Sequence, residues 1–83
     1  MEDKIDIEKI YKIIGENVAR ERKNKGLSQL QLSLKMGHNS VSIVSAAERY
    51  YRKKHFNLEH LFQIAAILEI EVSVLIDTTT IEE

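Results

Sequence analysis

A run of basic and hydroxyl-bearing side chains between residues 50 and 57 is the part of this sequence best suited to hold phosphate groups. It contains Tyr50, Tyr51, Arg52, Lys53 and Lys54. Lysine and arginine attract phosphate oxygens by charge, and tyrosine hydroxyls add neutral hydrogen-bond donors. We expect Tyr50, Arg52, Lys53 and Lys54 to contact the phosphates of a nucleic-acid backbone. The alternative is a solvated surface loop.

The charge of the whole chain is segregated along the sequence. Formal net charge is only −1, yet residues 18–57 carry nine Lys or Arg and two Glu, which gives +7. Residues 58–83 carry six acids and no Lys or Arg. A local excess of positive charge attracts phosphates even when the whole protein is nearly neutral. A solvated charged face is again the alternative.

Other site chemistries find little support in these residues. The histidines are His38, His55 and His60, and none has a partner at the i, i+4 spacing of a helical metal site. Cysteine is absent, and neither Gly15 nor Gly37 belongs to a glycine-rich phosphate loop. We see no nucleophile with its base and no paired catalytic carboxylates. The expectation is a protein without catalytic residues, metal or cofactor.

The 83 residues suffice for one domain, and they suggest no membrane or export segment. The longest apolar run is far shorter than the roughly 20 residues that span a bilayer, and the opening MEDKIDIEKIY is too acidic for a signal peptide. We therefore expect a cytoplasmic protein with no membrane partner. Its expected parts are an acidic extension at 1–9, one domain at 10–76 and a tail at 77–83.

The apolar spacing predicts an all-α domain of five helices. Proline is absent, so helices can run uninterrupted, and Gly26 and Gly37 are placed to end two of them. Ser28 with Gln31 predicts a capping box, while Ser40 and Asn57 are further N-cap candidates. The expected helices cover residues 8–25, 28–36, 41–50, 57–68 and 72–76.

The second and third of these helices, joined by a turn at Gly37, form a plausible helix-turn-helix. The small Ser33 allows the two helices to approach closely, and the core-facing side chains are Leu32, Met36, Val44 and Ala47. The opposite face of the third helix is then directed outward. It consists of Val41, Ser42, Ser45, Ala46 and Arg49.

An ordered set of residues resembles the signature of the Cro and lambda-repressor helix-turn-helix family, also called the xenobiotic-response-element family. The set is Gly26-Leu27-Ser28-Gln29, Leu32, Ser33, Gly37, Ser42, Val44 and Glu48-Arg49. The resemblance extends from about residue 13 to residue 76 and implies a compact five-helix, lambda-repressor-like domain that binds double-stranded DNA and regulates transcription. Two departures are a turn at 38–40 that is one residue longer than the commonest form and a longer loop at 50–57.

The resemblance also implies roles for individual residues. The third helix would enter the major groove, with Gln29 and Ser40 binding phosphates at the starts of two helices, or simply starting those helices. Arg22 would pair with Glu48 and tie the third helix to the first. A homodimer formed through residues 70–81 would present two such helices, roughly 34 Å apart, to a two-fold operator.

The outward face lacks the side chains that read guanine or adenine with two hydrogen bonds. Val41 or Ala46 can touch a thymine methyl, Ser42 and Ser45 can each make one hydrogen bond, and Arg49 can reach a phosphate or a base edge. The competing hypothesis keeps the helix-turn-helix scaffold but uses this face to bind a protein, as in an antitoxin or regulatory partner. Apolar readout residues favour that alternative, and the basic block opposes it.

Overall fold

The computed structural model describes residues 5–79, and within them the chain is helical with no β-strand. The elements are α1 (Ile7–Asn24), α2 (Gln29–Lys35), α3 (Ser42–Arg49), the short 3-10 turn η1 (Tyr51–Lys53), α4 (Leu58–Leu68) and α5 (Val72–Leu75). The expected all-α, five-helix fold is confirmed. Residues 1–4 and 80–83, and with them Ile81 of the expected dimer segment, lie outside the described residues.

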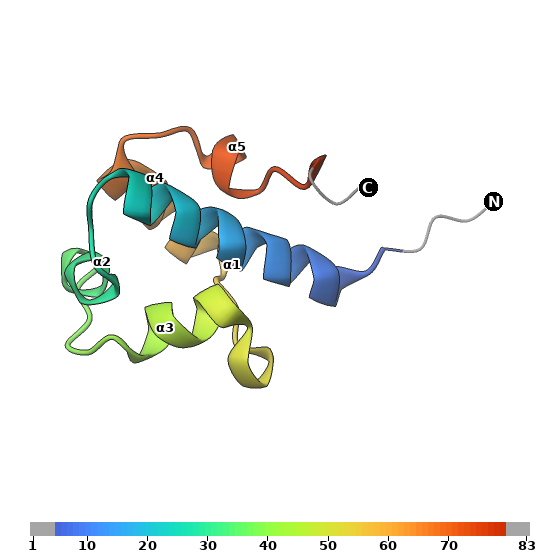
Figure 1. The fold of residues 1–83 in the computed structure, drawn as a ribbon, viewed down its shortest axis with the longest axis horizontal. Coiled ribbons are helices and arrows are strands. Elements are labelled where there is room, and N and C mark those ends of the chain that lie inside the picture. The colour runs from blue at the N-terminus through green and yellow to red at the C-terminus, as the bar shows by residue number, and fades with distance from the viewer. Residues whose placement is uncertain (1–4, 80–83) are drawn as a thin grey trace.

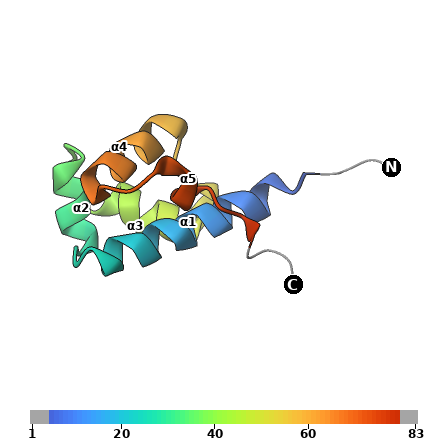
Figure 2. The ribbon, with the colours of Figure 1, turned by 90° about the horizontal axis from the view of Figure 1, so that it is seen from above.

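The long helix α1 runs through the middle of the domain. Figure 1 shows α3 on one side of α1 and α5 on the other, and Figure 2 shows α4 beside α2. Asn17 on α1 is buried, and its Nδ2 donates to the carbonyl oxygens of Leu75 and Asp77, both at 2.9 Å. This side chain therefore fastens the C-terminal segment to the central helix. Across residues 5–79, no helix combines the length and apolar character needed to cross a membrane.

The starts and ends of α1 and α2 follow the local sequence signals. Gly26 and Gly37 take positive φ angles, +81° and +93°, in the turns that follow these helices. The capping box of α2 is present: Ser28 Oγ accepts from the Gln31 N–H at 3.0 Å, and Gln31 Oε1 accepts from the Ser28 N–H at 2.7 Å. The expected capping box and both glycine turns are confirmed.

The third helix is one residue shorter at each end than the expected 41–50. Val41, and not Ser40, is its N-cap residue. Ser40 lies one residue before the N-cap, and its Oγ accepts from the Ser42 N–H at 3.3 Å, so it still contacts the first turn of the helix. At the other end Tyr50 has φ 55°, which turns the chain out of the helix. The left-handed conformation at Tyr50 was not apparent from the sequence, because this region favours glycine and asparagine.

The core brings all five α-helices together. Its buried apolar side chains are Ile14, Val18, Leu32, Met36, Val44, Ala47, Phe56, Leu61, Ile64, Ala65, Leu68 and Leu75. The four residues expected to pack the helix-turn-helix are among them. Leu58 opens α4 and stays 68% exposed although it is apolar, whereas Phe56 in the preceding loop is buried.

Gly15 sets the distance between α1 and α3. A Cβ atom at this position would lie 2.6 Å from the carbonyl oxygen of Glu48 and 2.7 Å from that of Ala47. Both are backbone atoms at the C-terminal end of α3, so a side-chain rotation cannot relieve the overlap. Only a hydrogen at position 15 allows α3 to pack this closely.

We predict that Gly15→Ala destabilises the domain. In an unobstructed helix this substitution would stabilise by about 0.5–1 kcal/mol, but overpacking against backbone costs about 1–3 kcal/mol or more. The unfolding free energy from urea denaturation should therefore fall. Glu16→Ala, at the exposed neighbouring position, is the control and should leave it nearly unchanged. Unchanged or higher stability for Gly15→Ala would contradict the close approach.

Candidate nucleic-acid interface

A buried ion pair holds α3 against α1. Arg22 Nε lies 2.7 Å from Glu48 Oε2, and Arg22 Nη2 lies 3.0 Å from Glu48 Oε1, so the guanidinium grips the carboxylate with two hydrogen bonds. The side chains are only 8% and 4% exposed. Arg22 Nη1 also donates to the Leu27 carbonyl at 2.9 Å. The pair thereby links α1, α3 and the loop before α2.

Gln29, at the start of α2, joins the same network. Its Nε2 donates to Glu48 Oε1 at 2.8 Å, so part of its hydrogen-bonding capacity is used within the protein. The half-buried side chain lies at the N-terminal end of α2, the place from which the sequence predicts a phosphate contact. Through its hydrogen bond to Glu48, the Gln29 side chain is connected directly to α3.

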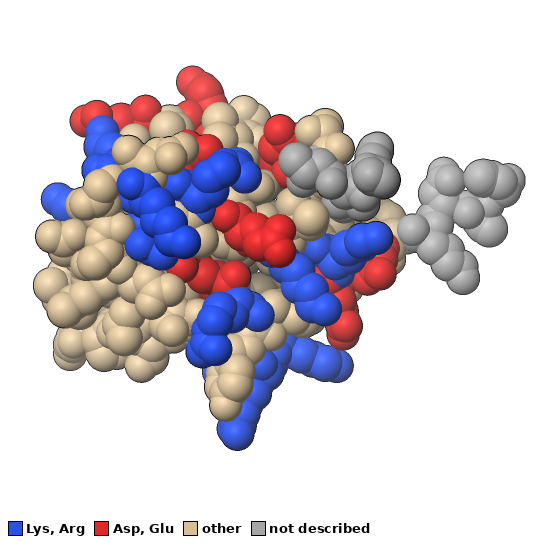
Figure 3. All heavy atoms as spheres, viewed as in Figure 1, with Lys and Arg blue, Asp and Glu red and all other residues tan. Residues whose placement is uncertain are grey.

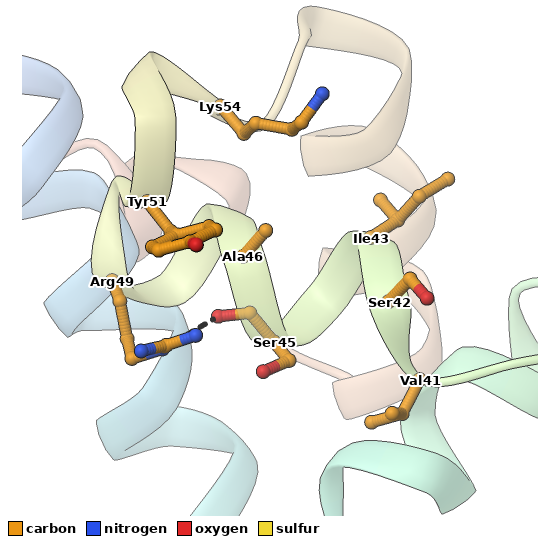
Figure 4. Close-up of a pocket in the computed structure, with 8 residues that line it drawn as sticks. All are labelled: Val41, Ser42, Ile43, Ser45, Ala46, Arg49, Tyr51 and Lys54. Atoms are coloured by element: carbon orange, nitrogen blue, oxygen red, sulfur yellow. Dashed lines mark hydrogen bonds between the residues drawn. The ribbon is translucent and has the colours of Figure 1, made fainter.

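The outward face of α3 borders a shallow hollow of about 510 Å³. Figure 4 shows that Val41, Ser42, Ser45, Ala46 and Arg49, all predicted to face DNA, line it together. Ile43, Tyr51 and Lys54 complete the lining. The structure thus brings the five base-facing candidates to one surface, on the opposite side of α3 from buried Val44, Ala47 and Glu48.

Tyr51 builds one wall of this hollow from the turn after α3. The Cζ atoms of Arg49 and Arg52 lie 5.1 and 5.3 Å from the centre of its ring, distances at which a guanidinium is attracted to an aromatic face. Arg49 Nε also donates to the Ser45 carbonyl at 3.4 Å. Tyr51 therefore orders two of the cations beside α3.

The loop from Tyr50 to Asn57 is anchored to the first half of α1 by aromatic stacking. The ring centres of Tyr11 and His55 are 3.7 Å apart, with an interplanar angle of 12°. The ring of Tyr50 also stacks on Tyr11, at a distance of 6.0 Å between ring centres. Lys53 Nζ lies 3.5 Å from Glu8 Oε2 across the same contact. Partial burial raises the pKa of Tyr50, and the Glu8 carboxylate raises it further.

The backbone of this loop is unusual for its composition. Tyr50, Arg52 and Lys53 all have positive φ angles, of 55°, 53° and 65°. Each left-handed non-glycine residue costs about 1–2 kcal/mol. The resulting compact turn leaves Arg52, Lys53 and Lys54 exposed. In Figure 3 basic side chains gather at the lower end of the molecule, around η1.

Within residues 5–79, no three or more histidine, cysteine, aspartate or glutamate side chains are grouped so that they could hold a metal ion. His60 takes a structural position instead, because its Nδ1 accepts from the Asn57 N–H at 3.1 Å and its own N–H donates to Asn57 Oδ1 at 2.7 Å. Burial lowers the pKa of His60, and nearby His38 lowers it further. A neutral imidazole is the form that this capping box at α4 requires.

The sequence did not single out several residues that shape this surface. Ile43 and Tyr51 line the hollow, Gly15 sets the position of α3, and Asn17 fastens the C-terminal segment. The i, i+3 spacing of Ile43 to Ala46 on α3 was a usable signal for Ile43. Tyr51 was recognised only as a member of the basic run, and its place in the hollow could not be inferred because that place depends on the left-handed residues on either side of it in the loop.

We predict that breaking the Arg22–Glu48 pair costs more than replacing it. Arg22→Met would leave a buried carboxylate without its cation, and Glu48→Leu a buried cation without its carboxylate, each a loss of about 3–5 kcal/mol, whereas the double change Arg22→Met with Glu48→Leu should restore much of the stability. Chemical denaturation of the two single variants and the double variant measures the coupling. Additive losses in the double variant would contradict the coupling.

The comparisons with known proteins agree with this geometry. A helix-turn-helix family model matches residues 18–75, which contain α2, α3, the basic loop and α4. No curated protein matches the chain. With a matched segment covering well over half of its length, the chain belongs to the helix-turn-helix family of DNA-binding regulators typified by Cro and lambda repressor.

Proposed function

We propose that this protein is a sequence-specific transcriptional regulator, of the repressor or controller type, that inserts α3 into the major groove of an operator. The observation that carries the proposal is the shared hollow along α3. Its lining brings all five expected base-facing residues together on one exposed side of the helix. A single α-helix fits the width of the B-DNA major groove.

The phosphate contacts of the proposed complex come from both ends of α3. Arg52, Lys53 and Lys54 extend from the turn after the helix and supply charge, with the Tyr50 hydroxyl as a neutral donor. Ser40 precedes the helix and Gln29 opens α2, so these two would hold the other side of the groove. Contacts to phosphates fix the orientation of a protein on DNA, and the groove-facing residues then read sequence.

Binding that rests on these cations must weaken as salt rises. We predict a linear fall of log K with log salt concentration, with a slope that becomes less steep by about 0.9 for each phosphate contact removed. Lys53→Ala combined with Lys54→Ala should therefore flatten the slope by about 1.8 and weaken promoter and scrambled duplexes alike. Fluorescence anisotropy with DNA from the promoter of its own gene measures this.

Lys25→Ala is the matched control for that experiment. Lys25 directly follows α1 and pairs at 2.8 Å with Glu69, which directly follows α4. Neither residue lines the hollow, so this change removes one positive charge without touching the proposed interface. It should leave the salt slope nearly unaltered. Equal slopes for the control and the double variant would argue against the loop as the phosphate-binding element.

The proposed regulator acts as a dimer through its C-terminal part, residues 70–81. In the described portion of that segment Ile76 is 45% exposed and Ile70 is half-buried, so apolar surface is available for a second copy. Two linked α3 helices bind a two-fold site more tightly than one because the second contact becomes intramolecular.

We expect Ile76→Asp to shift the protein to monomer in sedimentation velocity and to weaken binding to a two-fold operator by about 100-fold, while binding to a half-site stays constant. Leu58→Asp is the control, since Leu58 is also exposed but lies on α4 outside the proposed segment. A wild-type protein that sediments only as a monomer, both free and on operator-length DNA, would rule out this part of the proposal.

A second candidate function is a protein-binding module on the same scaffold. The observation that favours it is apolar exposure on the helix-turn-helix, where Leu30, Leu34 and Ile43 are 48%, 54% and 41% exposed. In Figure 3 the surface over α2 and the start of α3 is largely uncharged, and basic side chains begin toward the end of α3. An apolar contact with a partner protein would not weaken steeply with salt, so the salt series separates the two functions.

A further inference from the structure

The floor of the hollow beside α3 is apolar, and its edge is charged. Figure 4 shows Val41, Ile43, Ala46 and Tyr51 around it, with the short hydroxyls of Ser42 and Ser45 between them. Among the described residues, Arg49 and Lys54 are the only charged side chains in the lining, and none of those that line it bears an amide or a carboxylate. A partner that binds in this hollow must therefore present apolar groups flanked by negative charges.

The major groove of DNA has this combination where thymines occur. Guanine presents two acceptors that suit an arginine or lysine, adenine suits an amide, and cytosine presents a donor that suits a carboxylate. Thymine alone among the four bases presents a C5 methyl group beside its O4 acceptor. The lining of the hollow complements the thymine methyl best, and a serine hydroxyl can donate to O4.

Arg49 does not change this assignment, because its guanidinium is turned toward Tyr51 and the Ser45 carbonyl and not toward the apolar floor (Figure 4). It lies 5.1 Å from the Tyr51 ring centre and donates to the Ser45 carbonyl at 3.4 Å. In that position it stands at the edge of the hollow, where a phosphate would approach. Lys54 supplies the second cation of the lining.

We infer that α3 selects its operator by the methyl groups of thymines, received in the hollow formed by Val41, Ile43, Ala46 and Tyr51. This rests on the proposed function, since it names the bases that the proposed DNA-reading surface prefers. It also adds Ile43 and Tyr51 to the specificity-determining residues. The operator half-site should accordingly hold thymines at the steps that α3 covers.

Replacing thymine by uracil tests the inference, because uracil lacks only the C5 methyl. Operators are first selected from a random duplex library with the full chain, and each enriched thymine is then replaced by deoxyuridine. A methyl buried in the hollow should be worth about a fourfold change in Kd, and several replaced together should multiply. Unchanged affinity after every replacement would overturn the inference.

Side-chain variants locate the methyl contact on the protein. Ile43→Ala and Val41→Ala should each reduce the uracil penalty at particular positions toward onefold, because the group that contacted the methyl has been shortened. Leu34→Ala is the matched control, as Leu34 is 54% exposed on α2 and does not line the hollow. A variant that merely unfolds would weaken thymine and uracil duplexes equally, and thermal denaturation followed by circular dichroism identifies it.

These measurements distinguish a failure of the proposed function from a failure of the methyl inference. If no duplex binds in a salt-sensitive way, the proposed function itself fails. If binding is salt-sensitive and prefers the selected sites, but uracil is tolerated everywhere and the variants keep full discrimination, only the methyl inference fails. A penalty that persists unchanged in both Ile43→Ala and Val41→Ala would likewise remove the hollow as its source.

Discussion

The carboxylate of Glu48 is the point at which the helices of the proposed DNA-binding surface are joined. Arg22 grips it from α1 with two hydrogen bonds, and Gln29 donates to it from α2, while Glu48 itself belongs to α3. Breaking such a buried pair leaves a charge without compensation, so the network strongly penalises any rotation of α3 away from α1. Gly15 acts in the same direction, because it lets the backbone of α3 approach α1 closely. The ion pair between Arg22 and Glu48 and the absence of a side chain at Gly15 together hold α3 with the same face directed outward.

Local signals were sufficient to predict most of the framework. Gly26, Gly37 and the Ser28–Gln31 box mark helix ends through interactions within four residues, and the structure has them where the sequence places them. The exposure of Leu58 and the burial of Phe56 were not predictable in this way. Both follow from the direction in which the loop enters α4. That direction is set by the left-handed residues Arg52 and Lys53 and by the stacking of His55 on Tyr11, a contact between distant segments.

In the candidate site, too, some residues could be predicted from local sequence and others could not. The helical period correctly groups Val41, Ser42, Ser45, Ala46 and Arg49 on one side of α3, because residues of a single short helix keep their relative positions. Tyr51 belongs to another element, and its ring reaches the hollow only because Tyr50 turns the chain out of the helix with a positive φ. Lys54 arrives by the same route. A surface shared by a helix and a strained turn requires the tertiary structure before its members can be named.

The physical character of this surface separates affinity from specificity. In the proposed complex, cations on the turn after α3 would attract every phosphate backbone equally, whereas the apolar floor of the hollow would distinguish bases by one carbon atom. The discrimination from a single methyl group is small, so a domain of this kind gains selectivity by summing several such contacts and by using two copies of α3. Rigidity then becomes the critical property, since a methyl contact is lost with a small displacement of the helix. The buried network around Glu48 and the close packing at Gly15 supply that rigidity, and for this reason the proposed base reading would depend on them even though neither lines the hollow.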